Sequence, residues 1–99
     1  MPELITLAKL SKELETLAGW SGDEKQIEKT FQRKDFKSAL DFVNKVGELA
    51  EKADHHPDIF LHGWNKVRIT LSTHSAGGVT GNDVQLARQI EEIPSADLK

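Results

Sequence analysis

Residues 59–72, IFLHGWNKVRITLS, decide the fold class of this chain. Apolar and polar residues alternate from position 67 to position 72, and this period of two is typical of a strand with one buried face. A shorter apolar run at 59–61 predicts a second strand, and the connection at 62–65 is short enough for a hairpin. Strands joined so closely pair antiparallel, which favours an α+β sheet over a parallel one.

Two helices are predicted before this hairpin, each from apolar residues that recur three and four positions apart. The first spans residues 3–18, and Gly19 ends it. The second begins after Asp35, whose carboxylate suits an N-cap. It ends near residue 53, because Pro57 disfavours helical geometry at the residue before it.

A third helix is predicted after the hairpin, where Thr80 suits the N-cap and Asp83 occupies the third helical position of a capping box. Residues 25–31 alternate imperfectly and favour a further strand over a helix, and a short strand near Trp20 would complete the sheet. The expected fold is therefore α+β, with a small antiparallel sheet of about four strands and three helices packed on one face. We expect one domain over residues 1–99.

Composition excludes several classes of protein. The chain has 99 residues, no cysteine and a formal net charge of −3. This length suits a single domain with a thin core. No apolar run approaches the ~20 residues of a membrane span, and the first residues do not resemble a secretory signal, so we expect a cytoplasmic protein. Basic residues are scattered, which argues against nucleic-acid binding.

The chemically distinctive feature is a group of histidines around the hairpin. His55 and His56 are adjacent at the predicted helix end and precede Pro57, and His74 follows the last strand. Histidine is the side chain whose unperturbed pKa lets it give and take protons near neutral pH. This arrangement indicates either a proton-transfer site or a metal site.

A zinc site is the first alternative, since three imidazoles and a carboxylate form a zinc-ligand set. Adjacent side chains beside an extended proline point apart, however, and the sequence has no helical His-x-x-x-His pair. We therefore expect no metal. A serine hydrolase is not indicated either, because no Gly-x-Ser-x-Gly motif is present.

The spacing Glu51-x3-His55-His56-Pro57-x6-Trp64-x9-His74-x8-Asp83 resembles the signature of the pterin-4a-carbinolamine dehydratases. The resemblance covers most of the chain through further blocks in the family's order, namely Gly19-Trp20, Lys34-Asp35-Phe36, Leu49-Ala50-Glu51-Lys52, Asn65-Lys66-Val67, Ile69-Thr70-Leu71-Ser72-Thr73-His74 and Leu86-Ala87. One departure is the six residues between Pro57 and Trp64, where many animal members have five and a tyrosine. It bears on what Trp64 contacts and not on the histidines.

The resemblance implies dehydration of 4a-hydroxytetrahydrobiopterin, the 4a-carbinolamine, to quinonoid dihydropterin and water. This is a lyase step in tetrahydrobiopterin recycling. It further implies that His55 and His74 transfer protons and that His56 chiefly holds the pterin. The residues implied in substrate binding are Asp54, His55, His56, Ser72, Thr73, His74 and Ser75. Asp83 either supports a histidine or only caps the last helix, and Trp64 either stacks on the pterin or packs.

The reaction changes no oxidation state, so we expect no cofactor, the pterin being the substrate. The resemblance also implies a homodimer or homotetramer and functional coupling to an aromatic amino-acid hydroxylase, with neither nucleic acid nor membrane as a partner. The alternative function is a non-catalytic interaction module, because animal members also serve as a dimerisation partner for a homeodomain transcription factor. The intact histidine set favours catalysis.

Overall fold

An antiparallel sheet of four strands forms the base of the computed structural model, which describes residues 3–94. The strands are β1 (Ser21–Gly22), β2 (Ile27–Gln32), β3 (Asp58–His62) and β4 (Lys66–Leu71), in the order β1-β2-β4-β3. Every pairing is antiparallel, including the β3–β4 hairpin. The predicted strands, the hairpin and the short strand near Trp20 are confirmed.

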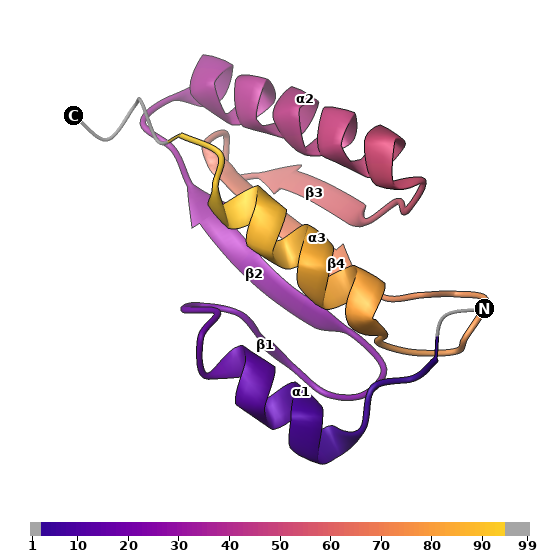
Figure 1. The fold of residues 1–99 in the computed structure, drawn as a ribbon. Helices are drawn as coiled ribbons and strands as arrows, with labels where there is room; N and C mark the ends of the chain where they lie inside the picture. Colours follow the sequence, from indigo (N-terminus) through magenta and orange to yellow (C-terminus); the bar gives the residue numbers. More distant parts are fainter. Residues whose placement is uncertain (1–2, 95–99) are drawn as a thin grey trace.

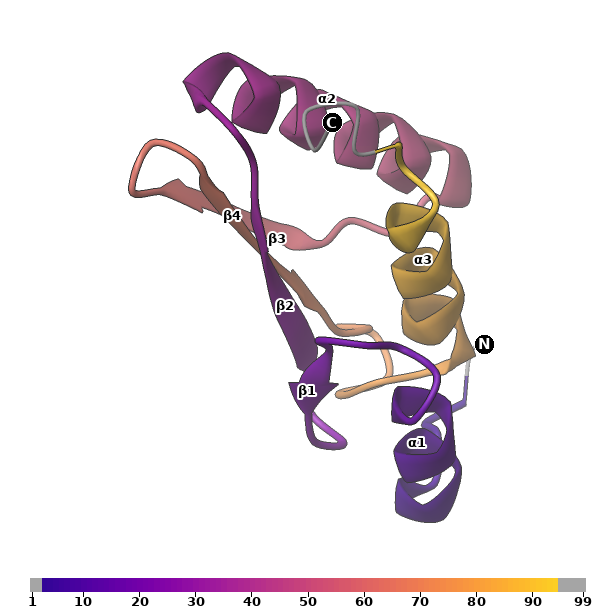
Figure 2. The same cartoon turned by 90° about the vertical axis from the view of Figure 1, so that its left-hand side faces the viewer.

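Three helices of the described region, α1 (Leu7–Leu14), α2 (Phe36–Ala53) and α3 (Gly81–Glu91), lie on the same side of the sheet. Figure 1 shows α3 beside α2, and the turned view in Figure 2 separates the sheet from the layer of helices. The predicted α+β class, with helices on one face, is therefore confirmed. No helix within residues 3–94 is long and apolar enough to cross a membrane.

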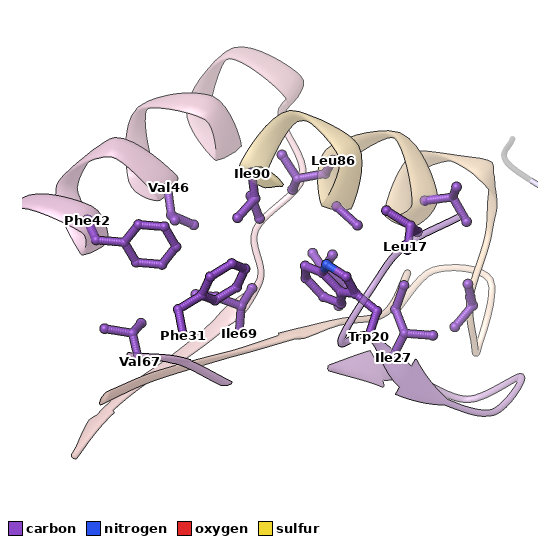
Figure 3. Close-up of a cluster of buried hydrophobic side chains, with 14 of the residues drawn as sticks. Leu17, Trp20, Ile27, Phe31, Phe42, Val46, Val67, Ile69, Leu86 and Ile90 are labelled. Atoms are coloured by element: carbon purple, nitrogen blue, oxygen red, sulfur yellow. The ribbon is translucent and has the colours of Figure 1, made fainter. Parts of the chain in front are cut away.

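The core lies between these two layers. Val67, Ile69 and Leu71 of β4 are each 0% exposed, as their alternation with polar residues predicts. Phe31 of β2 packs against Phe42 of α2 with ring centroids 4.7 Å apart, and Figure 3 shows both among side chains from α2 and α3. This packing fixes the two longer helices against the sheet and so fixes where their ends lie.

Caps define the ends of α2. Asp35 accepts a hydrogen bond of 2.8 Å from the backbone N–H of Ser38, as predicted for an N-cap. This hydrogen bond is the main reason that the pKa of the Asp35 carboxyl is lowered. At the other end, Asp54 adopts the left-handed conformation with φ 50°, and the N–H of His55 donates to the carbonyl of Ala50 at 3.1 Å. The chain therefore turns sharply just before the histidine pair.

The first helix is shorter than the 3–18 that the leucine spacing predicts. Thr6 takes the N-cap by accepting a hydrogen bond of 3.2 Å from the N–H of Lys9, so α1 begins at Leu7. Leu4 instead forms an isolated antiparallel bridge with Thr80, at the start of α3. The next residue continues this pairing, since the N–H of Ile5 donates to the carbonyl of Val79 at 2.9 Å, so residues 4–5 are held as extended chain and not as a helical turn.

Candidate active site

His55 and Asp83 form the centre of the candidate site. The Nε2 of His55, just after α2, is hydrogen-bonded to Oδ1 of Asp83 in the first turn of α3. The Asp83 side chain is 0% exposed and that of His55 is 12% exposed. A buried carboxylate is costly unless charged or hydrogen-bonding groups surround it. The sequence left two alternatives for Asp83, a helix cap or a contact with a histidine. The structure shows both, because Asp83 caps α3 and also contacts His55.

The second carboxylate oxygen of Asp83 is held from the other side. Oδ2 accepts hydrogen bonds of 2.8 Å from the hydroxyl of Thr73 and from the backbone N–H of Thr80. The hydroxyls of Thr73 and Thr80 are themselves 2.8 Å apart. Both threonines are buried, at 5% and 0% exposure. This cluster joins the end of α2, the segment after β4 and the start of α3.

His74 lies one residue beyond this cluster. The loop that carries it is closed by hydrogen bonds from the N–H of Thr73 to the carbonyl of Gly78 at 2.8 Å, and from the N–H of Gly77 to the carbonyl of Thr73 at 2.9 Å. Gly77 has a positive φ of 79°, which a side chain would disfavour. The His74 residue is exposed at the top of this tight loop. Thr73 thus anchors the loop of His74 to the carboxylate that holds His55.

His56 points away from its neighbour, as predicted for adjacent residues beside a proline. Its Nε2 lies 2.6 Å from Oε2 of Glu51, and both side chains are exposed, at 59% and 78%. Glu51 belongs to the last turns of α2, so His56 contacts a side chain of the helix that it follows. Within residues 3–94, no group of three or more His, Cys, Asp and Glu residues could hold a metal ion. The zinc alternative therefore finds no ligand set in this part of the chain.

Two hollows adjoin the histidine pair. The first is a cleft of ≈ 360 Å³ between α2 and α3, which falls in the size range of small-molecule sites. Its lining residues are Leu49, Lys52, Ala53, His55, Asn82, Gln85, Leu86 and Gln89. The second, of ≈ 870 Å³, is more open and includes His56, Pro57 and Ile59. Lys52 borders both hollows, so they adjoin at the end of α2.

Other predicted site residues lie in different surroundings. Asp54 and Ser75 are exposed beside the two histidine segments, and the hydroxyl of Ser72 donates to the carbonyl of Lys25 at 2.8 Å. Trp64 is 61% exposed at the tip of the β3–β4 hairpin, with a positive φ of 58°. The histidine segments flank the other end of that hairpin, roughly 16 Å away for a five-residue strand. Within one chain, Trp64 is therefore not brought to the histidines.

Comparison with known proteins identifies the family. The model of the family described as pterin 4 alpha carbinolamine dehydratase matches residues 3–93. The chain belongs to this family. The expectation drawn from the histidine spacing is thereby confirmed, and the match includes every residue of the candidate site.

Individual members of the dehydratase family are similar over nearly the whole chain. A protein of Roseiflexus castenholzii, provisionally named a pterin-4-alpha-carbinolamine dehydratase, is 50% identical over 93 residues, which cover 94% of this chain and 99% of the relative. A Brucella melitensis crystal structure described as a transcriptional coactivator/pterin dehydratase has a TM-score of 0.82 and 37% identity, covering 88% of this chain and 94% of that one. A pterin dehydratase-like protein identified as a RuBisCO assembly factor in the alpha-carboxysome shares the fold, with a TM-score of 0.58, 22% identity and coverage of 73% and 82%.

Two contacts in this dehydratase-family site were not predicted from the sequence. The sequence predicts Thr80 only as a helix cap, yet its hydroxyl is also hydrogen-bonded to that of Thr73. Glu51 opens the family spacing but was given no partner, and it contacts His56. No local pattern signals the first contact, because the capping box Thr-x-x-Asp pairs Thr80 with Asp83 and not with Thr73. The five-residue separation across a helix end was the available signal for the second.

Proposed function

We propose that this protein dehydrates a 4a-hydroxytetrahydropterin to quinonoid dihydropterin and water. The observation that carries the proposal is the pair of His55 and Asp83 on the wall of the α2–α3 cleft. Membership of the dehydratase family supplies the reaction class. The buried pair supplies what that reaction requires, which is an imidazole held in one orientation beside space for a ring.

The chemistry sets two demands on the site. The C4a–O bond breaks, and hydroxide is a poor leaving group, so a general acid must protonate the oxygen as it departs. The N5 lone pair drives this departure, and a base must then accept the N5 proton. A positioned imidazole contributes on the order of 10²–10⁴-fold in each role. We assign the two proton transfers to His55 and His74.

The two histidines suit this division of work in different ways. His55 is nearly buried and fixed by Asp83, so its ring can meet the substrate without first reorienting. His74 is exposed on its loop, where it can exchange protons with solvent between turnovers. Because Thr73 contacts Asp83 directly, the backbone before His74 is held relative to His55.

The pterin would lie across the end of α2 and would also have to reach His74, which lines neither hollow but follows Thr73, the residue bonded to Asp83. His56 and Glu51 border the more open hollow, His55 borders the cleft, and Lys52 lies between them. The polar edge of a pterin ring placed there would contact the His56–Glu51 pair, and its reacting edge would face the cleft. We therefore assign His56 to binding. In the cell the reaction would belong to tetrahydropterin recycling in the cytoplasm, beside the hydroxylase that forms the carbinolamine.

A non-catalytic interaction module is the second candidate, favoured by the description of the Brucella melitensis structure as a transcriptional coactivator/pterin dehydratase. The buried Asp83 argues for catalysis. Buried ionic groups seldom stabilise a fold more than apolar residues of the same volume would. The capping of α3 accounts for a carboxylate at Asp83, but it does not account for the histidine held against its second oxygen.

The test is to add the purified protein to an aromatic amino-acid hydroxylase reaction and to follow the decay of the carbinolamine by ultraviolet absorbance. We expect decay above the spontaneous rate, in proportion to the protein added. An unchanged decay rate with folded protein would contradict catalysis and favour the interaction module.

A further inference from the structure

The hydrogen bond to Asp83 uses one of the two ring nitrogens of His55. Nε2 faces the buried carboxylate, so Nδ1 is the nitrogen that remains for a substrate in the adjoining cleft. An ionised carboxylate accepts hydrogen bonds and donates none. When His55 is neutral, the ring proton must therefore lie on Nε2, and Nδ1 carries the lone pair.

The hydrogen bonds behind Asp83 have only one consistent set of directions. Thr73 donates its hydroxyl proton to Oδ2 of Asp83 at 2.8 Å. A hydroxyl has one proton, so the 2.8 Å contact between the two threonine hydroxyls must use the proton of Thr80. Thr80 in turn accepts from the backbone N–H of Asn82 at 3.2 Å. The donors thus run from the first turn of α3, through both threonines, to the carboxylate.

In this arrangement neither threonine donates to Oδ1 of Asp83. Oδ2 already receives the hydroxyl of Thr73 and the N–H of Thr80, both at 2.8 Å. These two donors fix the orientation of the carboxylate. Oδ1 is then available to His55 as an acceptor, which is the condition for keeping the ring proton on Nε2.

We propose that Thr73 is a positioning residue for His55, acting through Asp83 to hold the neutral ring with its proton on Nε2 and its lone pair on Nδ1. The consequence for turnover rests on the proposed function, whereas the state of the ring does not. The Thr73 side chain is buried and turned toward Asp83, so its hydroxyl is assigned to this task and not to contact with the pterin.

The first measurement is ¹⁵N NMR of the His55 ring in the substrate-free protein, with the signals assigned by their loss in His55→Asn. We expect the wild-type ring to carry its proton on Nε2. Thr73→Val keeps the branched shape and replaces the hydroxyl by a methyl group, which removes one donor from Oδ2. Without the Thr73 hydroxyl, the Asp83 carboxylate can rotate away from the ring, so Nε2 loses its fixed acceptor and the ring should show a mixture of both tautomers. Thr73→Ser restores the hydroxyl and should return the ring to the wild-type state.

The second measurement separates positioning from a merely structural role. Thr73→Val should lower kcat on the order of tenfold, the scale on which outer partners of a fixed imidazole act, with KM little changed. Thr73→Ser should recover most of this loss. Thr30→Val is the matched control, because Thr30 is exposed on the opposite face of the sheet and should leave both the ring and kcat unchanged.

Two results would overturn the assignment. One is a wild-type His55 that carries its proton on Nδ1, which decides the question even if Thr73→Val does not fold by circular dichroism. The other is a folded Thr73→Val with an unchanged ring and unchanged kcat. A wild-type protein with its proton on Nε2 but without dehydratase activity would refute the proposed reaction alone and leave the positioning role in place.

Discussion

Asp83→Asn is the substitution that separates the two functions of this carboxylate. The asparagine oxygen can replace Oδ2 and accept from Thr73 and from the Thr80 backbone, so the helix cap is retained. Its NH2 group then faces Nε2 of His55, where the carboxylate had accepted a hydrogen bond. To accept from this NH2 group, the ring must move its proton to Nδ1. His55 would then present an N–H to the cleft in place of a lone pair.

The size of the effect follows from these exchanged contacts. A general acid or base contributes on the order of 10²–10⁴-fold, and His74 together with the spontaneous reaction sets a floor, so we expect kcat to fall about 10²-fold. Folding should suffer less, because each hydrogen bond is kept in a neutral form. We expect a loss of roughly 1–3 kcal/mol in the free energy of unfolding.

The assay is steady-state kinetics with urea unfolding on the same preparations. Asp41→Asn is the matched control, since Asp41 is 61% exposed on α2 and should change neither quantity. Because Asp83 acts through His55, the double variant His55→Asn/Asp83→Asn should be no slower than His55→Asn alone. A folded Asp83→Asn with near-normal kcat, or effects that simply multiply in the double variant, would refute this account.

Four further predictions follow from the site and the fold. His56→Ala should mainly raise KM, and Glu51→Gln should do the same to a smaller degree, in steady-state kinetics; a fall in kcat without a change in KM would contradict the binding role. Exhaustive chelation should leave the rate unchanged, whereas loss of activity that zinc restores would revive a metal site. Sedimentation at micromolar concentration should give the mass of a homo-oligomer of at least two chains, and a mass of one 11.0 kDa chain would contradict this prediction. The lowered pKa of Asp35 stabilises the fold above its unfolded value of 3.8, and this contribution is lost as the pH falls through the folded pKa. Asp35→Asn, which also caps well, should therefore flatten part of the acid-induced fall in stability, measured by circular dichroism, and an unchanged acid profile would show that this carboxyl does not contribute.

The elements with local signals were predictable from the sequence. The strand at 66–71 was predictable because every second residue in it is apolar. In the structure these alternate residues are the buried ones. The start of α3 was predictable because Thr80 and Asp83 form a complete capping box within four residues. The approximate end of α2 was predictable from Pro57, which disfavours helical geometry at His56.

What the sequence could not show depends on contacts between distant segments. The leucine period alone extends the first helix to residue 3, whereas Thr6 caps α1 and Leu4 pairs with the distant Thr80. Asp83 and His55 are 28 residues apart, so their contact exists only once α3 packs beside α2. Trp64 belongs to the same family spacing as the histidines, yet the length of the hairpin separates it from them. Spacing along the chain indicated candidate residues of the site but not their contacts.

The most direct test of catalysis by these histidines is the decay rate of freshly generated carbinolamine, measured with the wild-type protein and with the double variant His55→Ala/His74→Ala. The account predicts acceleration by the wild-type protein and a rate close to the spontaneous one with the double variant, both folded by circular dichroism. A folded double variant that still accelerates decay like the wild type would show that His55 and His74 are not the acid and base.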